Sequence, residues 1–312
     1  MRAAFSDALI RLAKADPNVL LLTGDHGYAL FDAFRKECPA QYINAGIAEQ
    51  NMVGMAAGLA RAGFRPFVYG LSAFIPLRVI EQIKLDVAHD KLPVVFIGDG
   101  AGFVYSHLGT SHQATEDIAC ARAIPDLSVY SPADRFELSA CMELAYQSRS
   151  AVYLRMGKSD RGDVHLAEPE ARIGALLEVK SGKPGDITFI ATGSLVRTAK
   201  DIAAQRYPDA AVWSAPFIKP IDSAKVTAIC ENSRAIVVLE EHSILGGLGS
   251  LICEIASESA PLRILRIGVR DRFSHHCGTY EYLLKEHELD RQAIEQRIRD
   301  YLASLPRANL CE

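Results

Sequence analysis

The chain has 312 residues, of which 49% are hydrophobic and 23% are charged, and its formal net charge is −4. This length suffices for about two domains with substantial cores, and an acidic balance without a Lys/Arg cluster argues against a nucleic-acid partner. Charged and apolar residues alternate at helical spacing in the first residues, and seven scattered cysteines lack a C-x-x-C motif, so we expect no signal peptide, membrane span, disulfide framework or zinc site, but a cytoplasmic protein with reduced thiols.

Short apolar runs alternate with helical patterns along the first half of the chain. Runs that end in Gly, Pro or Asp are typical of parallel strands buried on both faces, and they occur at 19–25, 67–70, 93–99, 127–132 and 151–157. Helices are expected between them, at about 3–15, 48–62, 75–90, 115–122 and 134–147. Asp134 is the expected N-cap of the last of these helices.

The same rhythm starts again in the second half. Strands are expected at 186–193, 210–214, 235–241 and 262–268, with helical segments between them and two more helices near 278–287 and 290–304. The polar stretch between the halves indicates a linker. The sequence therefore predicts an α/β protein of two domains, each a mostly parallel sheet flanked by helices, with bounds 1–165, 166–185 (linker) and 186–312.

The most informative segment is GIAEQNM at 46–52, in which Glu49 precedes a run of small residues at 53–63. By itself Glu49 could equally be a first-turn residue favoured by the helix dipole. Three other segments carry polar or aromatic side chains beside turns, namely 66–90 with Phe74 and Arg78, 109–125 with His112, and 153–162 with Arg155 at a strand end, where α/β proteins place ligands. Each of these residues, taken alone, is more simply explained as structural.

In this order and spacing, the segments resemble the transketolase family, specifically its pyrimidine-binding and C-terminal domains. The resemblance runs from Arg2 to about residue 300 and includes LEEHSILGGLGS at 239–250 and IGVRDRFSHHCGTYEYLL at 267–284. It implies the fold of those two domains and a dependence on thiamine diphosphate.

The resemblance also implies which residues serve the cofactor. Glu49 is expected to bond N1′ of the aminopyrimidine, so that the cofactor's own 4′-imino group can remove the proton from C2 of the thiazolium. Phe74 matches the aromatic residue that stacks on the pyrimidine, and Asp25 matches an acid near the cofactor. Leu71 and Arg78, on the same segment as Phe74, complete the expected cofactor-binding set.

Substrate contacts follow from the same resemblance. His112 matches a catalytic histidine that faces the carbonyl side of the donor. Arg155 and Arg2 match arginines that bind the sugar phosphate, a role suited to a planar, permanently charged group.

One family feature is missing from this chain. Thiamine enzymes hold Mg²⁺ and diphosphate with a GDG followed about two dozen residues later by Asn, whereas GDG at 98–100 here has no Asn between Asn51 and Asn232. We interpret it as a decoy at a strand end. The chain also starts where the family's pyrimidine domain starts, which predicts a split transketolase. A separately encoded N-terminal subunit would then supply the diphosphate site and Mg²⁺ (or Ca²⁺) in an α₂β₂ heterotetramer, and no metal site is expected in this chain.

The match departs from the family where substrate is recognised. Gly100, Leu108 and Ala29 stand where the family has a His, an Asp and a phosphate-binding Ser, and Leu71 replaces an aromatic residue. A buried polar site loses affinity when such partners are removed. We therefore expect transfer of a two-carbon ketol or related acyl unit between sugars or sugar phosphates, with altered specificity that extends to modified or nucleotide-linked sugars.

Two residues beside the altered turn could supply replacement contacts. His107 is the expected substrate-binding residue of this pair, and Tyr105 is the second candidate. Both are also compatible with ordinary loop positions.

Two alternatives to transketolase activity remain. A β subunit of a 2-oxoacid dehydrogenase E1 component shares the two-domain layout and the pyrimidine-site glutamate, and would hand an acyl group to lipoamide. A non-catalytic partner or scaffold could keep the fold without activity, although loss of Glu49 or His112 would then be expected and both are present.

Overall fold

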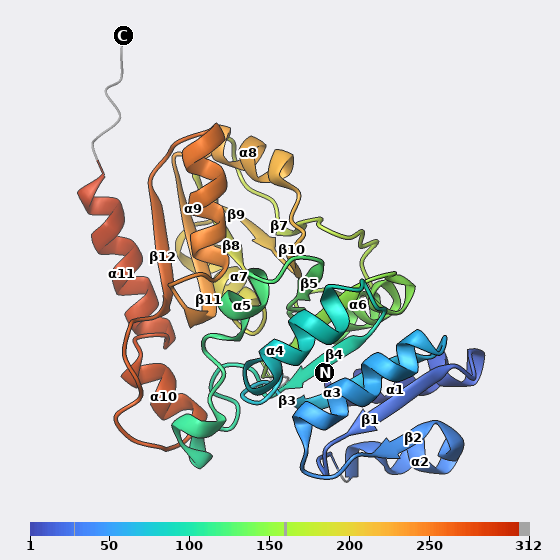
Figure 1. Ribbon diagram of the computed structural model, residues 1–312. Helices are drawn as coiled ribbons and strands as arrows, with labels where there is room; N and C mark the ends of the chain where they lie inside the picture. The colour runs from blue at the N-terminus through green and yellow to red at the C-terminus, as the bar shows by residue number, and fades with distance from the viewer. Residues whose placement is uncertain (28, 159–160, 306–312) are drawn as a thin grey trace.

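A seven-stranded sheet forms the centre of the first unit of the protein, whose computed structural model describes residues 1–27, 29–158 and 161–305 (Figure 1). The strand order is β10-β5-β6-β4-β3-β1-β2, and all neighbours are parallel except β10 with β5. The strands are β1 (Val19–Thr23), β2 (Tyr42–Asn44), β3 (Arg65–Leu71), β4 (Val95–Asp99), β5 (Leu127–Tyr130), β6 (Ala151–Met156) and β10 (Phe217–Lys219). Their apolar runs are buried because helices cover both faces.

Helices on the two faces of this sheet belong to two different hydrophobic clusters. One face is covered by α1 (Arg2–Ala15), α2 (Asp32–Glu37) and α6 (Arg135–Gln147), and the other by α3 (Glu49–Arg61), α4 (Ile80–Gln82), η4 (Ile83–Ala88) and α5 (Asp117–Arg122). The carboxylate of Asp134 accepts hydrogen bonds from the amides of Phe136 (3.0 Å) and Glu137 (2.9 Å), so the predicted N-cap of α6 is confirmed. Short helical turns connect these elements: η1 (Ala29–Phe31), η2 (Pro39–Gln41), η3 (Leu77–Val79), η5 (Ser106–Leu108) and η6 (Thr110–His112).

The second unit is built on a five-stranded sheet with the order β12-β11-β8-β9-β7. Its strands are β7 (Leu177–Lys180), β8 (Ile187–Ala191), β9 (Ala211–Ser214), β11 (Ala235–Ser243) and β12 (Ile264–Val269). One face packs against α7 (Leu195–Arg206), α10 (Tyr280–Glu286) and α11 (Arg291–Ser304), and the other against α8 (Ser223–Glu231) and α9 (Leu248–Ser259). No helix among the described residues is long and apolar enough to cross a bilayer.

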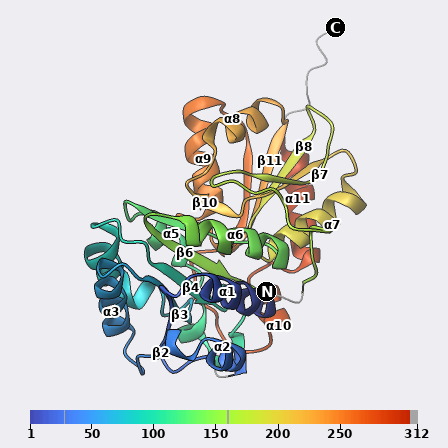
Figure 2. The same ribbon diagram turned by 90° about the vertical axis from the view of Figure 1, so that its right-hand side faces the viewer.

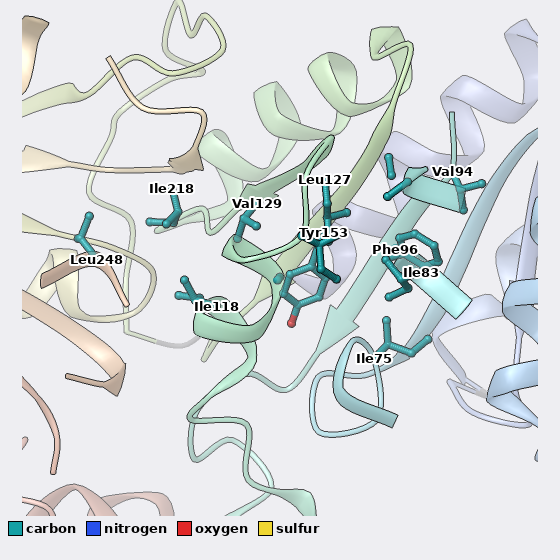
Figure 3. Close-up of a cluster of buried hydrophobic side chains, with 14 of the residues drawn as sticks. Ile75, Ile83, Val94, Phe96, Ile118, Leu127, Val129, Tyr153, Ile218 and Leu248 are labelled. Carbon is teal, nitrogen blue, oxygen red and sulfur yellow. The ribbon is translucent and has the colours of Figure 1, made fainter. Parts of the chain in front are cut away.

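One hydrophobic cluster joins the two units. It runs from helices α3 and η4 through Ile118, Val129 and Tyr153, and then past Ile218 on β10, to Leu248 of the second unit (Figure 3). Figures 1 and 2 show the second unit, yellow to red, packed beside the end of the first sheet that carries β5 and β10. The units therefore share apolar core in addition to the chain that links them.

The predicted fold class, two domains with mostly parallel sheets, is confirmed, and three details differ. The expected linker at 166–185 contains β7, which pairs antiparallel with β9, so the second sheet begins inside that segment. Strand β10, from the second half of the chain, completes the first sheet. The single helix expected over 75–90 starts after Pro76, whose ring fits only the beginning of a helix, and passes through η3 and α4 into the wider π-type turns of η4.

Candidate active site

Glu49 opens helix α3 and points its carboxylate into the protein. The turn before it contains Gly46, whose φ of +72° favours glycine, and the Glu49 side chain is only 4% exposed. A carboxylate at a helix N-terminus is stabilised by the helix dipole. One oxygen, Oε1, accepts a hydrogen bond of 3.0 Å from Nη1 of Arg78, so this acid has a partner that comes from another segment of the chain.

Phe74 and Arg78 lie after strand β3 and face Glu49. The guanidinium carbon of Arg78 is 3.9 Å from the centre of the Phe74 ring, which is a stacked cation–π contact. The ring of His112 meets the same Phe74 ring at 5.3 Å between centroids and an angle of 64°. Glu49, Phe74, Arg78 and His112, all predicted site residues, are therefore brought together from three separate segments.

The geometry around Glu49 suits a flat, nitrogen-rich ring. The Arg78 guanidinium is planar, lies over the face of Phe74 and donates to the Glu49 carboxylate. These are the two contacts that an aminopyrimidine would need from this chain, a stacking face and an acceptor for a ring N–H. The residues present therefore fit the pyrimidine end of thiamine diphosphate.

A pocket of about 380 Å³ adjoins these residues at the carboxyl ends of β1 and β3. His26 connects this pocket with the residues around Glu49, because it lines the pocket and its ring centroid lies 6.2 Å from that of Phe74. The predicted residues Arg2, Asp25 and Leu71 also line this pocket. The structure thus gathers them in a space that adjoins the Phe74 ring.

The GDG tripeptide at 98–100 ends strand β4 next to this pocket. The Asp99 carboxylate is held by Arg2, with Nη2 to Oδ2 at 2.6 Å, and by the hydroxyls of Tyr69 (2.8 Å) and Tyr105 (3.0 Å). Gly100 has a φ of +79°, and a Cβ there would lie 2.0 Å from the Tyr105 ring. These contacts tie Asp99 to three residues of the pocket lining, Arg2, Tyr69 and Tyr105, and give GDG a structural role beside the pocket.

Arg155 is not available to a substrate, contrary to its predicted role in phosphate binding. Its side chain is 3% exposed, and its donors are used inside the protein, by Asp117 Oδ2 (2.7 Å) and by the carbonyl oxygens of Ala114 (3.1 Å) and Glu241 (2.9 Å). The strand-end position was predicted correctly, but strand β11 of the second unit covers that end of the sheet. Arg155 therefore holds the protein together and is not a candidate substrate contact.

The remaining positions discussed from the sequence differ in whether they line the pocket. His107 and Leu108 are exposed on η5, and neither lines the pocket beside Phe74. Ala29, which stands at the position of the family serine, does line it.

Sequence reasoning missed His26 and Tyr69, which line the pocket, and Asp99, which pairs with Arg2 of the lining. His26 directly follows Asp25 in the loop after β1, so the strand-end rule applied to both residues would have found it. Asp99 was seen only as part of the GDG motif. Within the part of the chain that the structure describes, no three His, Cys, Asp or Glu side chains are grouped so that they could hold a metal ion.

Both units of the chain match known protein families. Residues 1–162 match the transketolase pyrimidine-binding domain, and residues 177–294 match the transketolase C-terminal domain. A putative transketolase C-terminal section from Methanocaldococcus jannaschii is 37% identical over 96% of this chain and 95% of its own length. One of the subunits of an apulose-4-phosphate transketolase from Phocaeicola vulgatus is 33% identical over 94% of both chains.

Among solved structures, a split-gene transketolase described as an inactive β4 tetramer superposes with a TM-score of 0.89. It is 32% identical, and the match covers 97% of this chain and 98% of that one. A 1-deoxy-D-xylulose-5-phosphate synthase from a Synechococcus strain is 35% identical, and this chain covers 46% of its length. The chain is thus similar over its whole length to separately encoded subunits and to one part of larger enzymes.

Proposed function

Since this chain belongs to the transketolase family, we propose that it is one subunit of a split, thiamine-diphosphate-dependent enzyme that transfers a two-carbon ketol unit between sugar substrates. The observation that carries the proposal is the arrangement of Glu49 and Phe74, which together already hold a planar, hydrogen-bond-donating group. A fold alone would not justify this conclusion, because one fold can host many activities.

Glu49 and Phe74 would hold the pyrimidine end of the cofactor. Phe74 offers its ring face, and the buried Glu49 carboxylate accepts a hydrogen bond from a ring nitrogen after Arg78 moves aside. When bound, the cofactor supplies the nucleophilic carbon at which the carbon–carbon bond is broken and formed.

His112 and Asp25 would act on the substrate side. The edge-on contact of His112 with Phe74 puts an imidazole within reach of a group bound beside the ring, where it can donate a hydrogen bond or a proton. Asp25 lines the adjoining pocket and accepts a hydrogen bond of 3.3 Å from Asn44 Nδ2. Its carboxylate is placed to accept from a sugar hydroxyl.

A separate partner subunit would supply the diphosphate site and its divalent cation. Near Glu49, the outer side of the protein exposes apolar and small residues: Ile47 is 78% and Leu85 53% exposed, and Gly54 and Gly58 on α3 have open space beside them. Such a surface suits close packing of another chain. Two copies of each subunit in an α₂β₂ assembly would bury it.

The two alternatives make different predictions for the assembled enzyme. A 2-oxoacid dehydrogenase subunit would support pyruvate-dependent reduction of a ferricyanide-type acceptor, and a scaffold would support neither reaction. Three relatives that match over more than 90% of both chains are described as a putative transketolase section and as transketolase subunits, which favours ketol transfer.

The test is reconstitution of this chain with its partner subunit and assay of ketol transfer. We expect activity that requires both chains and thiamine diphosphate. Replacement Glu49→Gln keeps the shape of the side chain but removes its charge, and should lower kcat by roughly 10²- to 10⁴-fold. Glu258→Gln, at an exposed position on α9, serves as the matched control. Unchanged turnover in the Glu49 variant would refute the catalytic assignment.

A further inference from the structure

The pocket beside Phe74 has walls unlike those of a site built for an anion. Ala29, Leu30 and Leu71 form an aliphatic side, and the Tyr105 ring closes another side by packing over Gly100. Because a Cβ at position 100 would lie 2.0 Å from that ring, the glycine makes room for the aromatic side chain at this end of the pocket.

The positive charge in this pocket is already neutralised. Arg2 is the one lysine or arginine that lines it among the described residues. Its guanidinium donates to Oδ2 of Asp99 from both Nη2 (2.6 Å) and Nε (3.1 Å), and also to the Tyr105 hydroxyl. The Asp99 side chain is only 4% exposed, so leaving it unpaired would cost the full desolvation of a buried charge. Arg2 is therefore held by the protein and not left for a ligand.

Tyrosine hydroxyls complete this arrangement. Tyr69 donates to Asp99 at 2.8 Å and Tyr105 at 3.0 Å. Burial, together with the Asp99 carboxylate, raises the pKa of Tyr105 to about 12. Its hydroxyl thus stays protonated at neutral pH and remains a donor to Asp99.

Among the Asp, Glu, Lys and Arg residues described in the lining of this pocket, the other charged group is the carboxylate of Asp25. A phosphate monoester carries a charge of about −1.5 to −2 at pH 7. It would meet no unpaired lysine or arginine among the described residues of this pocket, whereas C–H groups would find an aliphatic wall and hydroxyl groups an acceptor in the Asp25 carboxylate.

We propose that this pocket receives the far end of the sugar substrate as an uncharged terminus, and that Asp99 and Tyr105 select against a terminal phosphate by holding Arg2. This inference rests on the proposed function, because it assigns the pocket to the substrate of the Glu49 site.

Two acceptor sugars that differ only in a terminal phosphate test the inference in the complex of this chain with its partner subunit. With hydroxypyruvate as an unphosphorylated two-carbon donor, kcat/KM is measured for ribose and for ribose 5-phosphate. We expect ribose to have the higher value, by about tenfold or more. An equal or higher value for ribose 5-phosphate overturns the inference while leaving ketol transfer established.

The variant Asp99→Asn tests the mechanism of selection. It keeps the size of the side chain but removes the carboxylate that neutralises Arg2. The value of kcat/KM for ribose 5-phosphate, divided by that for ribose, should therefore rise at least tenfold. Asp90→Asn, which disrupts an exposed pair with Arg61, is the matched control and should leave the ratio unchanged. If the Asp99 variant does not fold, Ala29→Lys adds a cation at an exposed position of the same pocket and should shift the ratio in the same direction.

Binding provides a readout that does not depend on turnover. Calorimetric titration of the same complex with ribose and with ribose 5-phosphate should give no tighter binding of the phosphorylated sugar. Tighter binding of ribose 5-phosphate, or an unchanged ratio in both variants, overturns the inference. Absence of transfer to either acceptor, with tighter binding of ribose, would instead count against the proposed function alone.

Discussion

Two ends of the first sheet's carboxyl edge carry similar charged side chains. One end is open, whereas the second unit packs over the other. At the open end, beyond β1 and β3, Arg2 and Arg78 are about half exposed and each pairs with a buried carboxylate. At the covered end, Arg155 near the end of β6 and Asp117 on α5 are both buried beneath strand β11. The same combination of arginine and acid thus lines a pocket at one end and holds two domains together at the other.

The difference has an energetic origin. A half-exposed arginine such as Arg78 can leave its partner at small cost when a ligand takes over the contact, because water already solvates its guanidinium. A buried pair has no such replacement, so its removal exposes the other charge to an apolar surrounding. We therefore expect changes at the covered end to alter stability, and changes at the open end to alter ligand binding.

Asp117→Asn should give the largest effect on stability. Asp117 Oδ2 accepts from Arg155 Nε (2.7 Å) and from the Tyr153 hydroxyl (2.6 Å). Loss of this charge leaves the Arg155 guanidinium buried without its counter-ion, which typically costs about 3–5 kcal/mol. The free energy of unfolding from urea titration measures the change.

Asp90→Asn provides the contrast for that measurement. Asp90 also pairs with an arginine, Arg61 at 2.6 Å, but both side chains are exposed. Its loss should change the free energy of unfolding far less. Similar costs for the two variants would show that burial does not separate these pairs, and the comparison of the two ends would fail.

Local sequence patterns predicted most of the fold but not the contacts between distant segments. Each long apolar strand of both sheets was found, whereas β2 and β10 have only three residues each and β7 is partly polar. The antiparallel pairing of β10 with β5 joins the second half of the chain to the first, and nothing in the local sequence encodes it.

The same limit, that local sequence does not encode contacts between distant segments, decides which site residues could be predicted. Glu49, Phe74 and His112 were identified through motifs whose order and spacing are specific. Arg155 was assigned to substrate because its strand-end position was visible, whereas the carbonyl of Glu241, 86 residues away, was not. Likewise, the packing of Tyr105 over Gly100 depends on the shape of a loop that carries no periodic signal.

The buried His242 should make stability at the covered end depend on pH, with a smaller effect than the loss of Asp117. It is fully buried at the covered end, where Nδ1 donates to the Ser243 carbonyl (2.7 Å) and Nε2 accepts from the Ala119 amide (3.3 Å). Burial lowers its pKa to about 4. The unfolded chain takes up this proton below about pH 6.5, before the folded protein does, so stability is lost as pH falls from about 6.5 to 4.

The variant His242→Gln isolates this contribution. Asp117 Oδ1 (4.0 Å) and Glu240 Oε2 (3.6 Å) face the ring, and burial raises the pKa of Glu240 to about 7, which favours folding as the pH falls. We therefore compare wild type and variant at pH 7 and pH 5. The wild type should lose about 2 kcal/mol more than the variant, at 1.36 kcal/mol per pH unit below 6.5. Parallel losses would contradict a neutral buried His242.

Arg78 at the open end should give the smallest effect and the most specific one. Its guanidinium covers Phe74 and binds Glu49, the two residues that we assign to the cofactor, so it must be displaced when the pyrimidine binds. An exposed cation–π contact and a half-exposed ion pair are together worth about 1 kcal/mol. Arg78→Gln should therefore tighten binding of thiamine diphosphate to the assembled complex by roughly fivefold, as measured by calorimetry, with Arg61→Gln as control. Weaker binding in the Arg78 variant would instead make this arginine a direct cofactor ligand, and the open end would then keep its arginine as firmly as the covered end does.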